Sequence, residues 1–219
     1  MKIDFHVHTK YSIDSLIEPK ALAEKSRKLG IIPAITDHNS TDCHKEMRKL
    51  GARFIPGEEI STDKGDLIGL YMGEMIAKKT PFLEAIDKIR EQGGIVYLPH
   101  MYDYGRSGKH ASESEAAEAD IVEVFNARCM KNEYNLRAMA FAINHGKLKA
   151  AGSDSHFLFE FGKTYAEMPD FDIGDPKALL KALKKAELKT KKAPIFVRGT
   201  TTFIAMGRKL LKSSHIQLG

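Results

Sequence analysis

Short β-rich runs alternate with amphipathic segments along most of this 219-residue chain. The runs predicted to be strands are 3–8, 31–35, 53–56, 66–72, 95–98, 121–125 and 149–152. The segments with helical periodicity are 18–29, 41–50, 80–92, 131–145, 176–189 and 200–212, with a small helix ending near residue 119. This alternation is typical of an α/β fold with a largely parallel sheet, which the pattern allows to be a closed barrel or an open sheet.

Length and composition favour a globular protein with one substantial domain. The hydrophobic fraction is 42%, and the two cysteines, Cys43 and Cys129, have no metal-type spacing. No apolar run reaches the length of a membrane span, and Met1-Lys2 leads directly into the first predicted strand. We therefore expect a cytoplasmic protein without a membrane partner.

The net charge of +5 is concentrated in the C-terminal part. From Lys177 onwards there are eleven Lys or Arg residues and one acid, Glu187. Such a segment can attract nucleic acid, although lysines more often form the solvated face of terminal helices. Residues 177–219 are therefore expected to be a basic helical part packing on the body of the domain. Phe203, Met206 and Leu210 share one helical face, for which core packing is preferred over a dimer contact.

The first strand carries two histidines on one face. His6 and His8 are two residues apart, so their side chains point to the same side of a strand and can reach one cation. Neutral imidazole suits Zn, Mn and Fe. The alternative is two surface histidines on an edge strand.

Similar groups recur where later strands end, which favours a shared site at the carboxyl edge of the sheet. The clustered residues are His6, His8, Asp14, Asp37, His38, Glu58, Glu59, His100, Glu123, Asp154 and His156, whereas His44 and His145 are expected on helix surfaces. Imidazole and carboxylate without thiolate fit a hydrolytic site better than a structural zinc site. The set is too large for one ion, so two or three close cations are predicted.

The order of these motifs resembles the PHP (polymerase and histidinol phosphatase) superfamily. The matching stretches are Asp4-Phe5-His6-Val7-His8-Thr9, Thr36-Asp37-His38-Asn39, Gly57-Glu58-Glu59-Ile60-Ser61, Pro99-His100 and Gly152-Ser153-Asp154-Ser155-His156. The resemblance runs from Met1 to about Glu167 and identifies the chain as a stand-alone PHP domain over 1–219. It implies a distorted (β/α)7 TIM-like barrel with the metal site at the carboxyl ends of the strands.

The resemblance also implies a ligand set for three cations. The first cation would be held by His6, His8, Glu59 and Asp154. Glu59 would bridge to a second cation, which His100 would also hold. The third cation would be held by Asp14, His38 and His156. Asp66 stands where many members have a histidine of the second site, so it is a possible ligand there. Asp37 is interpreted as a residue that orients a ligand.

The activity implied is hydrolysis of a phosphate ester by a metal-activated hydroxide, with a phosphorylated small molecule or nucleotide as substrate. Arg128 is predicted to clamp the phosphate in the reaction, the alternative being a salt bridge to Glu123 or Glu133. Arg106, Lys109 and His110 follow His100; a solvated loop is favoured for them, and Arg106 is also a candidate substrate contact.

Two residues near the predicted site have open assignments. Glu123 is a core-edge carboxylate or a ligand, and Asn126 could orient a ligand or the substrate. Two other functions are weighed against the phosphoesterase. A PHP-type nuclease could use the basic tail, although aromatic residues are not interleaved with its basic ones. A non-catalytic binding subunit is disfavoured by the retained ligand set.

Overall fold

The structure, a computed structural model, describes residues 1–106 and 108–216, with side chains up to residue 211. The strands are β1 (Lys2–Val7), β2 (Ile31–Ile35), β3 (Ile55–Thr62), β4 (Gly65–Leu70), β5 (Ile95–Leu98), β6 (Ile121–Asn126), β7 (Leu148–Gly152), β8 (Tyr165–Glu167) and β9 (Glu187–Lys189). The helices are α1 (Pro19–Leu29), α2 (Cys43–Lys49), α3 (Phe82–Glu91), α4 (Glu113–Ala116), α5 (Asn132–Asn144), α6 (Pro176–Leu183) and α7 (Phe196–Ile216). The predicted α/β alternation is therefore confirmed.

One sheet holds these strands in the order β7-β6-β5-β4-β3-β2-β1-β8-β9. The sheet curves round so that the segment after β7 meets the end of β1. There the amide of Asp154 donates to the carbonyl of His6 (2.8 Å), and the amide of His8 donates to the carbonyl of Ser155 (3.0 Å). β1 to β7 thus form a nearly closed, distorted (β/α)7 barrel, as predicted.

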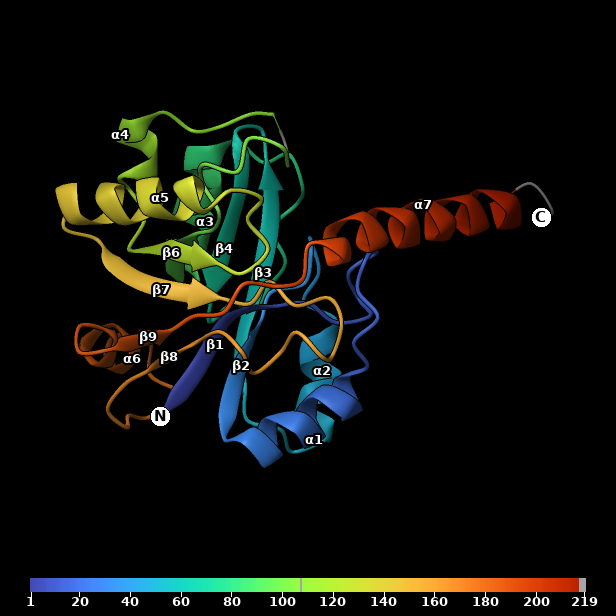
Figure 1. The fold of residues 1–219 in the computed structure, drawn as a ribbon, viewed down its shortest axis with the longest axis horizontal. Coiled ribbons are helices and arrows are strands. Elements are labelled where there is room, and N and C mark those ends of the chain that lie inside the picture. The colour runs from blue at the N-terminus through green and yellow to red at the C-terminus, as the bar shows by residue number, and fades with distance from the viewer. Residues whose placement is uncertain (107, 217–219) are drawn as a thin grey trace.

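Helices cover the outside of the barrel, with α1 and α2 on one side and α3, α4 and α5 on the other (Figure 1). This arrangement explains why the parallel strands read as nearly continuous apolar runs, since both faces of such strands are buried. β2, Ile-Ile-Pro-Ala-Ile, is buried at every residue.

The sheet departs from the predicted parallel pattern at β4. β4 runs antiparallel to both β3 and β5, because only Asp63 and Lys64 separate it from β3. So short a connection can join only antiparallel neighbours. The hairpin places Ser61 opposite Asp66, and Glu59 opposite Ile68.

Two further predictions about elements are wrong. The helix expected over 176–189 ends at Leu183, and Glu187–Lys189 is instead β9, which pairs antiparallel with β8. His44, expected on a helix surface, is 3% exposed, and its Nε2 lies 3.0 Å from the carbonyl oxygen of Gly57.

The last helix is longer than predicted, and it extends away from the barrel (Figure 1). Phe203 is 74% exposed, Met206 56% and Leu210 69%, so the expected packing of this apolar face on the barrel is wrong. The face that meets the barrel instead includes Val197 and Thr201, which are both buried. Residues 217–219 of the predicted basic segment lie outside the described residues. Among the helices that the structure describes, none combines the length and apolar character needed to cross a bilayer.

Candidate metal centre

Imidazole and carboxylate groups converge at the carboxyl end of the barrel. They come from the end of β1 and its loop (His6, His8, Asp14), the turn after β2 (His38), β3 (Glu59), β4 (Asp66), the turn after β5 (His100) and the segment after β7 (Asp154, His156). Most are almost fully buried, whereas His38, Asp14 and Asp66 are partly exposed. The structure thus brings together every predicted ligand.

Glu59 lies at the centre of the cluster. Its Oε2 is 2.9 Å from His38 Nδ1, 3.3 Å from His8 Nε2 and 3.4 Å from His6 Nε2. Its Oε1 is 2.9 Å from His100 Nε2. One carboxylate therefore reaches ring nitrogens on both sides of the site. Glu58, the neighbouring candidate, points elsewhere, because its Oε2 accepts from the amide of Ile76 at 2.9 Å.

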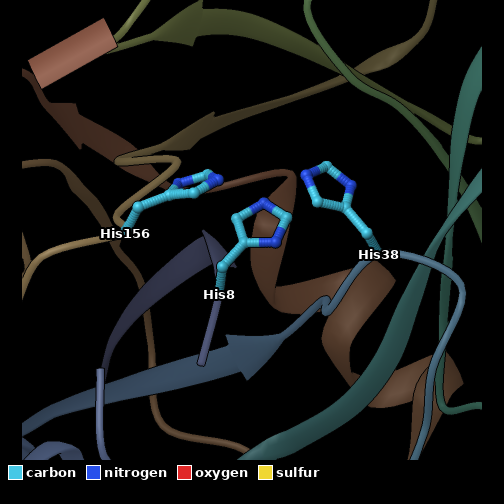
Figure 2. Close-up of side chains that lie close together, drawn as sticks. All are labelled: His8, His38 and His156. Atoms are coloured by element: carbon cyan, nitrogen blue, oxygen red, sulfur yellow. The ribbon is translucent and has the colours of Figure 1, made fainter. Parts of the chain in front are cut away.

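The rings of His8, His38 and His156 point toward one another from three different parts of the chain (Figure 2). The ring centroid of His8 is 4.4 Å from that of His38 and 4.2 Å from that of His156. Asp14 completes this side, with Oδ2 3.1 Å from His156 Nε2 and Oδ1 3.7 Å from His38 Nε2.

Asp154 adjoins the histidines of β1. Its Oδ1 is 3.4 Å from His8 Nε2 and 3.8 Å from His6 Nε2. Asp66 lies near Glu59 and His100. These three residues offer ligand atoms within 4.8 Å of one another. Asp66 thus occupies the position suggested for a possible ligand in the second group.

The donor set fits cations better than it fits a hydrogen-bond network. Glu59 Oε2, Asp154 Oδ1 and Asp14 Oδ1 are buried, yet none accepts a hydrogen bond from a residue that the structure describes. Nε2 of His6 and Nε2 of His8 face each other at 3.0 Å. Buried polar atoms are normally paired, so oxygens and nitrogens that converge without donors are typical of a metal-binding site.

The electrostatics are those of a coupled buried cluster. Burial opposes ionisation of Glu59, but His38 and His6 outweigh it and hold the pKa of this carboxyl well below its usual range. The same holds for Asp14, whose pKa is lowered because His156 and His38 outweigh burial. Burial, together with His156 and His38, lowers the pKa of His8 well below its usual value. The acids are therefore held as carboxylates and His8 as a neutral imidazole, the protonation states that ligate metals.

Two site residues have strained backbones. His100 has φ 26° and Asp154 has φ 52°, in the left-handed region that non-glycine residues rarely adopt. Each lies two residues after a strand ends, His100 after β5 and Asp154 after β7. Such conformations cost free energy and persist where the surrounding contacts enforce them, as they do at functional sites.

Glu123 contacts two histidines of the cluster. The sequence alone leaves open whether it is a core-edge carboxylate or a ligand. Its Oε1 is 3.1 Å from His6 Nδ1 and accepts from the hydroxyl of Tyr97 at 3.0 Å. Its Oε2 accepts from the amide of His100 (2.8 Å) and from Nδ2 of Asn126 (2.9 Å). Glu123 thus holds two histidines in place. Its only sequence signal was its position near a strand end.

Asp37 contacts the site through its neighbours. Its carboxylate accepts from the amide and hydroxyl of Thr9, both at 2.6 Å, and from the hydroxyl of Ser12 at 2.7 Å. Ser12 Oγ is 3.0 Å from His8 Nδ1. This geometry matches the interpretation of Asp37 as an orienting residue. The sequence does not single out Ser12, because a serine in a polar loop carries no distinctive pattern.

A cavity of about 430 Å³ opens over the cluster. It is lined by Asp14, His38, Glu59, Ser61, Thr62, Asp66, Gly105, Arg106, Arg128, His156, Arg198, Thr201 and Thr202. Its size is within the usual range of small-molecule sites. Three arginines thus share a wall with the acidic and imidazole groups.

Arg106 enters the site, so the solvated-loop interpretation is wrong for this residue. Its Nη2 donates to Oδ2 of Asp154 at 2.6 Å and to Oδ1 of Asn126 at 3.3 Å. His110 is partly buried, and its ring meets Tyr104 edge-on with centroids 4.4 Å apart. Its Nε2 has no hydrogen-bond partner among the described residues.

Arg128 is buried, and its ion pair is with Glu160 (3.4 Å), not with Glu123 or Glu133, the partners of the alternative interpretation. Its Nη2 donates to the carbonyl of Val197 and the hydroxyl of Thr201 on α7. The guanidinium therefore fastens α7 to the rim of the cavity. Its predicted role as a phosphate clamp stays a prediction.

Comparison with known proteins agrees with this geometry. A family model described as PHP-associated matches residues 132–188. The chain is 41% identical over 186 residues to MJ0417, an uncharacterized protein of Methanocaldococcus jannaschii, covering 82% of this chain and 75% of that protein.

Two solved structures share the fold at low sequence identity. One is a two-domain protein from Bacteroides vulgatus whose description includes a predicted PHP-like metal-dependent phosphoesterase; it has a TM-score of 0.68 and 17% identity. The match covers 86% of this chain but only 64% of that one. The other is PsfC from Pseudomonas syringae, with a TM-score of 0.64, 13% identity, and coverage of 96% and 98%. The motifs, the barrel and these similarities together show that the chain belongs to the PHP superfamily.

Proposed function

We propose that this protein is a metal-dependent phosphoesterase. The observation that carries the proposal is the environment of Glu59, whose Oε2 lies within 3.4 Å of three imidazole nitrogens and accepts no hydrogen bond from a described residue. A buried carboxylate surrounded by imidazole nitrogens is the arrangement expected of a bridging ligand.

The donor atoms divide into three neighbouring groups. One cation would be held by His6, His8, Glu59 and Asp154, and a second by Glu59, Asp66 and His100. A third would be held by Asp14, His38 and His156 together with the adjacent His8 ring. Two or three divalent ions are therefore proposed. Imidazole and carboxylate ligands admit Zn, Mn and Fe alike.

The proposed hydrolysis follows from the groups that line the cavity. When bound, such cations supply Lewis acidity and lower the pKa of a coordinated water toward neutrality. The chain itself supplies positive charge beside them, because Arg106 Nη2 lies 2.6 Å from Asp154 Oδ2 and Arg128 and Arg198 line the same cavity. Guanidinium groups match the geometry of phosphate oxygens, so a phosphate ester is the substrate class that this wall favours. The Bacteroides vulgatus protein, described as containing a predicted PHP-like metal-dependent phosphoesterase, supports the same class.

The test is hydrolysis of an aryl phosphomonoester and the matching diester by protein stripped of metal and then given Mn, Zn or Fe(II). We expect turnover that requires added metal. Glu59→Ala should lose at least a hundredfold in kcat, whereas the neighbouring Glu58→Gln should keep activity, because Glu58 faces the Ile76 amide. Equal activity of wild type and Glu59→Ala would exclude the proposal.

The same assay decides between two phosphoesterases. Preference for the monoester supports a phosphatase acting on a small molecule or nucleotide. Preference for the diester supports a nuclease, which the basic C-terminal segment would favour. No turnover despite stoichiometric metal would instead support a non-catalytic binding subunit.

A further inference from the structure

α7 meets the barrel through one face, which differs from its apolar face. Val197 and Thr201 are buried, and Arg208 is partly buried. Their spacing of four and then seven residues places them along one side of a helix. Phe203 and Met206 lie on another side and are exposed. The helix thus meets the domain through a face that includes both apolar and polar residues and lies apart from its exposed apolar face.

Arg208 makes the most concentrated of these contacts. Its Nη1 is within hydrogen-bond distance of three backbone carbonyls, those of Ser12 (3.0 Å), Ile13 (3.2 Å) and Ser15 (3.0 Å). All three belong to the loop after β1, which reaches α7 in Figure 1. Carbonyl oxygens that converge on one point repel one another unless a cation lies between them, and an arginine keeps its charge at any accessible pH. Arg208 therefore joins α7 to this loop through three of the loop's carbonyl groups.

The same loop carries groups of the metal centre. In sequence, Asp14 lies between Ile13 and Ser15, two of the residues whose carbonyls Arg208 contacts. Its carboxylate faces His156 and His38. Ser12 Oγ is 3.0 Å from His8 Nδ1, and Ser15 Oγ donates to the carbonyls of His8 and His156, both at 3.2 Å. A change in the loop's curvature would move Asp14 relative to both histidines.

We propose that Arg208 is a positioning residue that holds Asp14 in place for the cation group of Asp14, His38 and His156. The inference rests on the proposed function. It makes α7 a structural part of the metal centre, although residue 208 lies far in sequence from every ligand. The coupling is selective: among the described residues, Arg208 makes no hydrogen bond or ion pair with Glu59, His100 or Asp66, so their cation group should not depend on it.

The test measures Mn(II) binding by equilibrium dialysis with metal analysis, on full-length Arg208→Gln. Asp14→Asn serves as the reference for loss of this cation group, and Lys209→Gln, at the exposed neighbouring position, is the matched control. We expect Arg208→Gln and Asp14→Asn to weaken the same class of Mn(II) sites at least tenfold and to leave the others unchanged. Lys209→Gln should bind as wild type does.

Two further variants separate positioning from general damage to the fold. Arg208→Lys should recover much of the binding, because an ammonium group can also donate to converging carbonyls. Arg208→Met, which keeps the aliphatic stem, should repeat the loss seen with Gln, and far-UV circular dichroism checks that both are folded. Wild-type binding by Arg208→Gln beside a loss in Asp14→Asn would overturn this inference and leave the proposed function standing. Wild-type binding by both Asp14→Asn and Glu59→Ala would overturn the proposed metal centre itself, and the inference with it.

Discussion

Glu123 accepts contacts from four groups at once, and two of them belong to metal-binding histidines in the proposed assignment: Nδ1 of His6 and the amide of His100. A carboxylate can accept on both oxygens, which a neutral amide cannot. Partners of this kind set the tautomer and orientation of a ligating imidazole, and their loss usually weakens metal binding.

Glu123→Gln should therefore lower metal affinity by about 10- to 100-fold. The amide nitrogen of the glutamine would replace a carboxylate oxygen that accepts hydrogen bonds, and it would face hydrogen-bond donors. His6 would then lose its fixed orientation. Competition titration against a chelating dye checks this, with Glu133→Gln on the exposed surface of α5 as control. Equal affinities for the two variants would show that Glu123 does not position His6.

Glu58 is fully buried, with Oε1 lacking any described partner, and burial raises the pKa of its carboxyl to about 7. The unfolded carboxyl has a pKa of 4.5. Between these values the folded state binds more protons than the unfolded state, so the free energy of unfolding should fall as pH rises through this window. Complete ionisation of the buried Glu58 carboxyl, above pH 7, lowers the free energy of unfolding by about 3 kcal/mol.

Glu58→Gln should remove this dependence. The variant should match wild type near pH 4.5 and exceed its free energy of unfolding by about 3 kcal/mol at pH 8.5. Urea unfolding of chelator-treated protein at both pH values measures the difference. A constant offset between the two proteins across this range would contradict the assignment of the raised pKa.

Among the elements, β7 is closely packed at its end, Gly152. A Cβ atom at Gly152 would overlap Glu123 Oε1 and His6 Cβ, because β7 passes close to β1 where the barrel closes. Glycine is required here for close approach of neighbouring strands rather than for its backbone freedom.

Gly152→Ala should lower the free energy of unfolding by about 1–3 kcal/mol, as overpacked cores do, and should also weaken metal binding because His6 must shift. Gly199→Ala is the matched control, since a Cβ there meets no atom within 4 Å. Chemical denaturation of both variants tests the contrast. If Gly152→Ala were as stable as Gly199→Ala, the close contact between β7 and β1 would not be tight in solution.

At the scale of the whole molecule, the domain is built around a cluster of carboxylate and imidazole groups. Glu59, Asp154 and Asp14 have lowered pKa values and converge within one site. Cations that bind the folded chain and not the unfolded one stabilise it by mass action. The barrel's stability should therefore depend on metal.

Removing metal with a chelator should lower the melting temperature, and adding Mn(II) at 100 times its Kd should restore about 2.7 kcal/mol for each site filled. For a domain of this size, that corresponds to roughly 5–10 °C per site. Differential scanning calorimetry with and without metal provides the measurement. A melting temperature that does not respond to Mn, Zn or Fe(II) would exclude a metal centre in these residues.

The sequence by itself determined most elements of the barrel and the set of residues that converge at its carboxyl end. Both follow from short-range information: the period of apolar residues specifies each strand or helix, and side chains at parallel strand ends meet at one edge. His6, His38 and His100 could be placed together for this reason without any knowledge of their contacts.

Only the tertiary structure decided what depends on partners far along the chain. The strand at Glu187–Lys189 pairs with β8, and α7 turns Val197 and Thr201 rather than Phe203 toward the barrel, where Arg128 and Arg208 contact this helix and its neighbouring loop. Arg208 meets a loop that is more than 190 residues away in sequence. Local propensity carries no record of such contacts, because the free energy that favours them arises only when the barrel has closed.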